Sequence, residues 1–207
     1  THLTFDSDFN QSLAEGVLPA TLTHLTFDSD FNQSLSVGVL PENLTDLIFA
    51  GRFNQSLSTG GLPASITNLL LGWRFNQPLL VGVLPVSLTH LTLGENFNQP
   101  LLVGVLPASL IHLTLGRNFN QRLTKPLPQG VRFLTLGEKF NRTVRFPPGL
   151  QTLTVPSDFP QGSLVKLSGS TRTLVYRGED TEPFHLLPSR KVAVKQQQIT
   201  AKALRQT

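Results

Sequence analysis

Apolar residues recur along this chain in a pattern that repeats every 22 residues over most of its length. Each repeat contains a Phe-Asn pair, and the pairs begin at Phe9, Phe31, Phe53, Phe75, Phe97, Phe119 and Phe140. A fixed period of this length is typical of a solenoid, because each unit can bury its apolar face only against its neighbours. The pattern therefore predicts one elongated body with a continuous core and extended outer surfaces.

Within each repeat, a short segment after a Leu-Pro pair alternates between apolar and polar residues. In the second repeat, Leu25 and Phe27 alternate with His24 and Thr26, which is the two-residue period of a half-buried strand. Strands joined by whole coils in one direction must be parallel. The opposite arc, such as 31–40, contains a glycine and leads into a proline, and both disfavour a helix. The sequence thus predicts a mainly β solenoid with coils of about 22 residues, one short parallel strand per coil and little or no helix on the return arc.

An asparagine follows the phenylalanine of each pair. Its amide offers two donors and an acceptor, so stacked copies can satisfy backbone groups of adjacent coils. We expect a structural ladder formed by Asn10, Asn32, Asn54, Asn76, Asn98, Asn120 and Asn141. Four of these lie in Asn-x-Ser/Thr sequons, which we interpret as by-products of the repeat. Only Asn43, on the proline turn, is then a candidate glycan site if the protein is secreted.

The repeat unit reads Leu-Pro-x-x-Leu-x-x-Leu-x-Leu-Gly-x-x-Phe-Asn-Gln-x-Leu and closely resembles the FNIP repeat, a leucine-rich-repeat-like module of social amoebae and giant viruses. The resemblance covers roughly 1–159, with Gln where the family name has Ile, as at Gln77 and Gln99. It implies a right-handed, leucine-rich-repeat-like solenoid that binds other proteins. In that family the repeats often accompany an F-box or kinase domain, and neither is visible in this sequence.

Composition narrows the class of protein further. The chain has 39% hydrophobic residues and no apolar run near the 18 or more residues that a membrane-spanning helix needs. It has no Cys, which excludes a disulfide framework and a zinc ribbon and favours an intracellular location. It also has no Met, so we expect it to be a fragment or a processed product.

Charge is distributed unevenly. Residues 1–51 contain seven acids and no Lys or Arg, whereas all 17 Lys and Arg residues come later. We therefore expect an electric dipole along the solenoid axis. One interpretation is head-to-tail association or orientation on a charged partner, and the other is a solvated surface without a partner.

The repeat decays after Phe159, although 171–176 and 191–195 still alternate like strands. Solenoids need terminal caps to cover the last coil. We therefore expect 160–207 to form degenerate repeats and a basic cap, packed on the same body as the solenoid of 1–159. Eight Lys and Arg residues against three acids in this segment also suit contact with nucleic acid.

Candidate catalytic chemistry is sparse. His2, His24, His90 and His112 share one outward strand column, but further ligands are not clearly supplied in the same coils, so we predict no metal site and no cofactor. The sequence contains no Gly-rich phosphate loop, no His-Glu-x-x-His and no nucleophile elbow. A catalytic site should also interrupt the repeat, and we predict that the chain is not an enzyme.

An interruption of another kind marks a candidate partner-binding site. The neighbouring outward column is mostly threonine, but Ile48 and Leu70 replace it in consecutive coils, near the only tryptophan, Trp73. An apolar centre with a polar border, Trp and Arg is typical of an interaction hot spot. The candidate residues are Asp46, Ile48, Arg52, Asn68, Leu70, Trp73 and Arg74. The alternative is that Trp73 folds over the sheet edge and packs within the chain.

These observations favour a non-enzymatic protein-interaction or scaffold solenoid, whose partner is another protein or a copy of itself. The alternative is a structural component of a larger assembly that associates end to end. The family resemblance also implies a role as the substrate-recognition arm of a ubiquitin ligase, and the basic C-terminal segment suits nucleic-acid contact.

Overall fold

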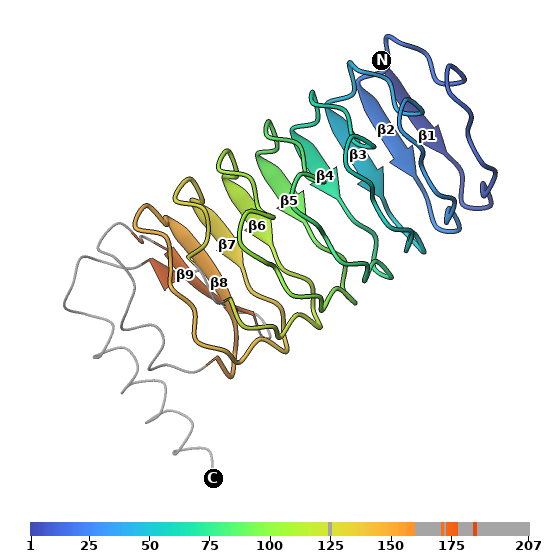
Figure 1. The fold of residues 1–207 in the computed structure, drawn as a ribbon. Helices are drawn as coiled ribbons and strands as arrows, with labels where there is room; N and C mark the ends of the chain where they lie inside the picture. The colour runs from blue at the N-terminus through green and yellow to red at the C-terminus, as the bar shows by residue number, and fades with distance from the viewer. Residues whose placement is uncertain (124–125, 160–170, 172, 178–183, 186–207) are drawn as a thin grey trace, which may run out of the picture.

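The computed structural model describes residues 1–123, 126–159, 171, 173–177 and 184–185. Each coil contributes one short strand, and the coils stack into an elongated solenoid (Figure 1). The described residues contain no helix. The strands are β1 (His2–Phe5), β2 (His24–Phe27), β3 (Asp46–Phe49), β4 (Asn68–Leu70), β5 (His90–Thr92), β6 (His112–Thr114), β7 (Phe133–Thr135), β8 (Thr152–Pro156), β9 (Thr173–Arg177) and β10 (Phe184–His185). The predicted solenoid with one strand per coil is confirmed.

The strands form a single sheet in sequence order, and β1 to β9 are parallel. Equivalent residues of successive repeats are aligned, as in the pairing of Leu25 with Leu47. The short final strand β10 pairs with β9 in the antiparallel direction, which the repeat pattern did not predict. The predicted strand within 171–176 corresponds to β9, whereas 191–195 and most of the proposed cap lie outside the described residues.

The core consists of columns of identical or similar side chains that run along the axis. Leu47, Phe49 and Ile66 are fully buried, as are their counterparts in the neighbouring coils. The phenylalanines of the Phe-Asn pairs stack face to face, with ring centroids 6.0 Å apart for Phe75 and Phe97 and 6.1 Å for Phe97 and Phe119. Each ring therefore fills its own coil and packs against two neighbours, as the period predicted.

The asparagine ladder runs beside this stack. The Asn76 side-chain oxygen accepts a hydrogen bond of 2.9 Å from the backbone N–H of Asn98 and one of 3.3 Å from the Gln99 amide in the next coil. The same pair of bonds is present from Asn10 through Asn98, and a longer backbone bond links Asn120 to Asn141. The glutamines that follow the asparagines thus extend the ladder.

A second ladder was missed from the sequence. The hydroxyl of Thr45 donates to the carbonyl oxygen of Thr23 in the preceding coil, and Thr67 and Thr89 repeat this contact. The signal was a threonine just before the outward histidine column, in 1, 23, 45, 67 and 89. These hydroxyls link successive coils at the start of each strand, so their role is structural.

Candidate functional site

The outward face of the sheet carries the first part of the predicted partner-binding site. Ile48 on β3 pairs in register with Leu70 on β4, and Asp46 pairs with Asn68 beside them. The Ile48 side chain is 36% exposed in a column whose other members are mostly threonines. These four residues form a small apolar and polar patch, hereafter the strand-face patch (Asp46, Ile48, Asn68, Leu70).

Asp46 is the electrostatic centre of this patch. Its carboxylate accepts hydrogen bonds from the Asn68 amide and from the Thr45 hydroxyl, and the His24 Nε2 atom lies 3.4 Å from it. Partial burial raises the pKa of Asp46, but the two hydrogen bonds and the charges of His24 and His2 outweigh it, so this pKa lies below its ordinary value. Asp46 is therefore a carboxylate at neutral pH, held in a fixed orientation by neighbouring coils.

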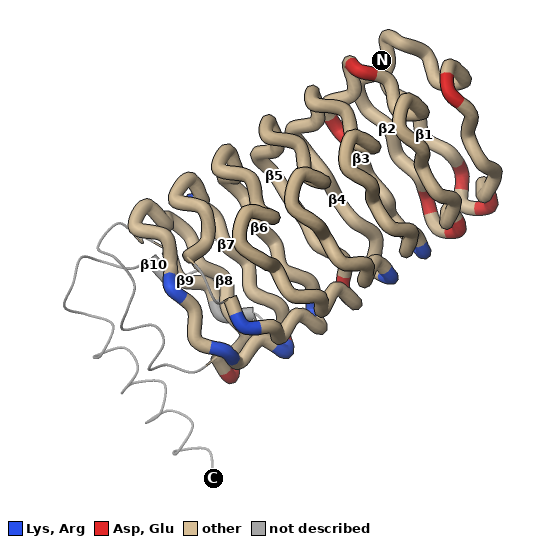
Figure 2. Tube along the Cα trace, in the orientation of Figure 1, with Lys and Arg blue, Asp and Glu red and all other residues tan. Residues whose placement is uncertain are grey.

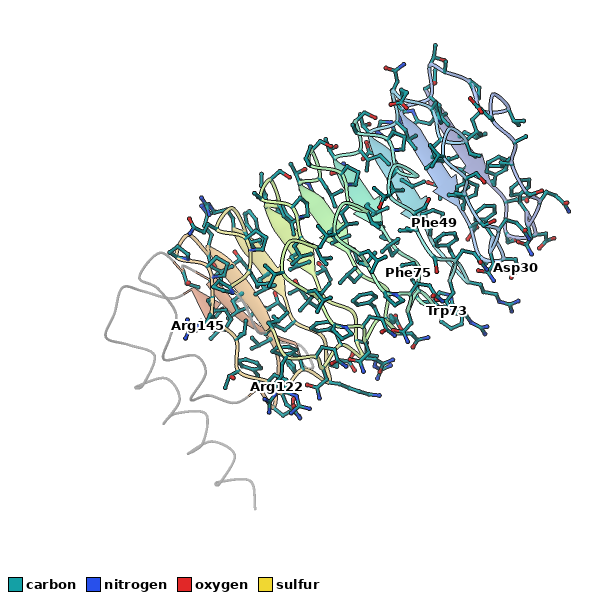
Figure 3. The ribbon with its side chains drawn as sticks, viewed as in Figure 1. Asp30, Phe49, Trp73, Phe75, Arg122 and Arg145 are labelled. Carbon is teal, nitrogen blue, oxygen red and sulfur yellow. The ribbon has the colours of Figure 1, made fainter. Side chains whose placement is uncertain are left out.

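The remaining predicted residues lie on the turn that follows each strand. Trp73 is 42% exposed, and the Arg74 guanidinium carbon lies 4.7 Å from the centre of its ring. Arg52, one coil earlier, forms an exposed ion pair of 3.3 Å with Asp30. The Trp73 side chain thus remains accessible instead of being packed away. Figure 3 shows it at a long edge of the solenoid, between Asp30 and Arg122.

The structure therefore divides the seven predicted residues into two groups. One is the strand-face patch, and the other is on the turns (Arg52, Trp73 and Arg74). Among the described residues, no hydrogen bond, ion pair or ring contact joins the two groups. Sequence proximity placed them together, but the strand and the turn face different directions around the coil.

The histidines form stacks on the outward face. The rings of His2 and His24 lie 3.9 Å apart, and those of His90 and His112 lie 4.1 Å apart. Partial burial and the nearby His90 charge lower the pKa of His112. In the described part of the chain, no group of three or more His, Cys, Asp or Glu side chains could hold a metal ion.

The return arc carries a second exposed apolar region. Leu80, Val81, Leu102 and Val103 are each 60% to 62% exposed. Leu102 and Val103 also line an open hollow of about 190 Å³, whose wall includes Leu106 and Leu123. Contiguous exposed apolar side chains of this kind often mark contact surfaces.

Among the described residues, no helix is long and apolar enough to cross a membrane.

Comparison with known proteins places this architecture in a family. The FNIP repeat family model matches residues 1–30, 31–74 and 75–118. The crystal structure of CroV588, a circular leucine-rich-repeat protein of a giant virus, is similar to this chain with a TM-score of 0.79 and 42% sequence identity. The similarity covers 91% of this chain but 29% of CroV588. No curated protein sequence matches the chain.

Proposed function

Because the chain belongs to the FNIP repeat family, we propose that it is a non-enzymatic solenoid that binds another protein through the strand-face patch, with Trp73 on the turn after β4 as a separate second contact. Repeat solenoids of this kind fit a protein-interaction scaffold, since stacking neighbours creates long surfaces of regular shape. What the chain binds is therefore expected to depend on positions where the repeats differ.

One observation carries the proposal. Along a column that is otherwise mostly threonine, Ile48 and Leu70 are the two adjacent apolar residues, and Ile48 is exposed on the open face of the sheet. Asp46 and Asn68 border them with a fixed carboxylate and amide. An exposed apolar centre with oriented polar neighbours is the composition that binding hot spots show.

A paired substitution tests the proposal. The full chain carrying Leu70→Asp and Trp73→Ala is compared with the unchanged chain for quantitative recovery of co-purifying proteins, followed by affinity measurement on the partner identified. We expect at least about 30-fold weaker binding, because hot-spot residues contribute 2 kcal/mol or more. Thermal unfolding of both chains verifies that the fold is retained.

The matched control places the same charge in the same column outside the patch. Thr114→Asp lies on β6, in the position equivalent to Leu70, and Val86→Ala removes an exposed apolar side chain elsewhere. We expect neither to weaken binding. If the paired variant binds as tightly as the unchanged chain, the assignment of this site is wrong.

A further inference from the structure

The turns that follow the strands stack into one continuous row, hereafter the turn edge. Its first seven turns are residues 6–8, 28–30, 50–52, 72–74, 94–96, 116–118 and 137–139, and an eighth turn, 156–158, carries the exposed Asp158. Backbone hydrogen bonds hold successive turns in register, with the N–H of Asn96 bonded to the Trp73 oxygen at 2.9 Å and that of Asn118 to the Glu95 oxygen at 2.8 Å. Because parallel strands are about 4.8 Å apart, the seven turns present side chains at nearly regular intervals over roughly 29 Å.

Charged residues occur along the turn edge in an ordered sequence (Figure 2). The first two turns carry only acids, namely Asp6, Asp8, Asp28 and Asp30. The third and fourth turns carry Arg52 and Arg74, and the fifth carries Glu95. The sixth and seventh turns carry Arg117, Glu138 and Lys139, with the exposed Arg122 and Arg142 following closely in the same coils. Reversing the first seven turns about the fourth therefore places acids opposite bases where the second turn meets the sixth and where the third meets the fifth, whereas Arg74 on the fourth turn meets its own copy.

We propose that a second copy of this chain binds along the turn edge in antiparallel orientation, with a two-fold axis at the fourth turn. This inference goes beyond the proposed function, because it concerns the turn edge and shares only Trp73 with the proposed partner-binding site. In this arrangement the first turn faces the seventh, the second faces the sixth, and the eighth turn extends beyond the contact. The acids Asp28 and Asp30 then face Arg117 and Arg122 of the other copy, and each contact occurs twice.

The third and fifth turns agree with the same arrangement. The third turn faces the fifth, so Arg52 meets Glu95, the single acid in the middle of the edge. A parallel arrangement would instead place the acidic turns against each other. Like charges in contact cost free energy, and complementary charges set the orientation of partners. The position of Glu95 thus distinguishes this pairing from a simple attraction between an acidic and a basic end.

Trp73 lies where the two-fold axis would cross the edge. It is 42% exposed, and Arg74 covers its ring face at 4.7 Å. On the axis, the two copies of Trp73 would face each other at the centre of the contact. Exposed aromatic residues near the centre of an interface are typical anchors.

The ion pairs within one chain do not prevent these side chains from pairing with a second copy. Arg52 pairs with Asp30 at 3.3 Å and Arg117 with Glu138 at 2.7 Å, and all four side chains are about half exposed. Exposed ion pairs contribute little to stability, so their charges remain available to a partner. The basic part of the edge contains the acid Glu138, whose pairing with Arg117 reduces its repulsion, and Asp158 follows on the eighth turn.

The symmetry predicts a closed dimer, whereas end-to-end association would continue into filaments. The contact is narrow, so we expect a dissociation constant of about 10 µM, as for small interfaces. It should weaken strongly between 0.05 M and 1 M salt, because the screening length falls to about 3 Å at 1 M.

Charge reversal with sedimentation velocity tests the proposal. Asp28→Lys with Asp30→Lys, and separately Arg117→Glu with Arg122→Glu, should each weaken self-association at low salt by at least tenfold. An equimolar mixture of the two variants should restore a species of twice the chain mass. If the mixture stays monomeric while the unchanged chain dimerises, the proposed pairing is wrong. A monomeric unchanged chain at low salt and 100 µM, about ten times the expected dissociation constant, overturns it as well.

Cross-linking locates the axis, because the chain contains no Cys. Arg74→Cys should form a disulfide-linked dimer under mild oxidation, since only a residue near a two-fold axis meets its own copy. The control Ser29→Cys should stay monomeric alone but cross-link to a second chain carrying Arg117→Cys. Cross-linking of Ser29→Cys alone, or species larger than dimers, would contradict the arrangement.

Loss of dimers with intact binding to another protein at Ile48 and Leu70 would remove this inference and leave the proposed function standing.

Discussion

At the residue scale, most regular polar positions serve the stacking of coils. The asparagine ladder accepts backbone N–H groups from the next coil, and the threonine ladder donates to carbonyl oxygens of the preceding coil. These groups would otherwise be partly buried without partners, which costs free energy. Their regularity therefore reflects the fold, and departures from it are better indicators of binding.

Removing one ladder asparagine should destabilise the solenoid. Asn76→Ala deletes the acceptor for the Asn98 N–H and for the Gln99 amide, so we expect the free energy of unfolding to fall by about 1–3 kcal/mol. Asn76→Asp retains an acceptor of the same shape and should lose less. Urea denaturation of both variants checks this, and equal losses would show that the accepted hydrogen bonds are not the cause.

His112 should make stability depend on pH. Partial burial and the His90 charge lower its pKa in the folded chain, so the unfolded chain binds the proton first as pH falls. The stabilising contribution is complete above the ordinary histidine pKa of about 6.5 and is lost as pH decreases through the lowered folded value. We expect His112→Gln to reduce the change in unfolding free energy between pH 7.5 and pH 5.

The range from pH 7.5 to pH 5 separates the contribution of His112 from that of Asp46. The pKa of Asp46 is also lowered, but its contribution is complete above the ordinary aspartate pKa and is lost only in more acidic solution. His90→Gln removes the neighbouring charge and should reduce the same pH dependence. A pH dependence that is unchanged in His112→Gln would contradict the assignment.

At the element scale, the turns differ between the two halves of the solenoid. The first three strands have four residues, whereas β4 to β7 have three and are each followed by a Leu-Gly pair. A Cβ atom added to Gly94 would lie 1.9 Å from the Gly72 carbonyl oxygen. Equivalent glycines at 116 and 137 have the same restriction. Close approach of successive turn backbones, and not the freedom of glycine in φ, requires these residues.

Alanine substitution should therefore separate two kinds of glycine. Gly94→Ala must displace a stacked backbone, and we expect a loss of at least about 3 kcal/mol in unfolding free energy. Gly82→Ala has a φ of +83° but no atom nearer than 3.7 Å to the new Cβ, so the cost should be about 1–2 kcal/mol. Thermal and chemical unfolding measure both, and a larger loss for Gly82→Ala would refute the packing explanation.

At the scale of the whole molecule, the solenoid is a one-dimensional array in which each coil contacts its neighbours. Its length generates long edges and faces, so charges that are far apart in sequence become ordered along one line (Figure 2). Stability in such arrays is approximately the sum of units and their interfaces. The function proposed for the chain uses the outer surfaces of this array and no enclosed pocket.

Deletion of one complete coil should preserve the fold. Removing 75–96 joins equivalent positions, because Phe97 takes the place of Phe75. We expect a loss of about 1–3 kcal/mol, the share of 22 residues in a typical domain, with a β-rich circular dichroism spectrum retained. Removing 75–85 instead breaks the register and should abolish cooperative unfolding. Similar spectra and stabilities for the two deletions would argue against the array description.

The sequence indicated which residues to group as a candidate site, but it could not give their geometry. Ile48 and Leu70 were found because they interrupt a regular column, and the register confirms that they are adjacent. Trp73 and Arg74 were grouped with them by proximity in sequence, yet they lie on the turn. A strand that ends at residue 70 leaves the direction of the next side chains to the turn, which the two-residue period does not describe.

The repeat period by itself determined the strands, their parallel order, the phenylalanine stack and the asparagine ladder. It could do so because every coil has the same apolar face, and such a face is buried when similar coils stack in register. Only the tertiary structure decided that Gly94 must lack a side chain, that Trp73 is accessible, and that charges from seven coils align on a single edge. These properties depend on contacts between coils and on turn direction, which are distances in space and not intervals in sequence.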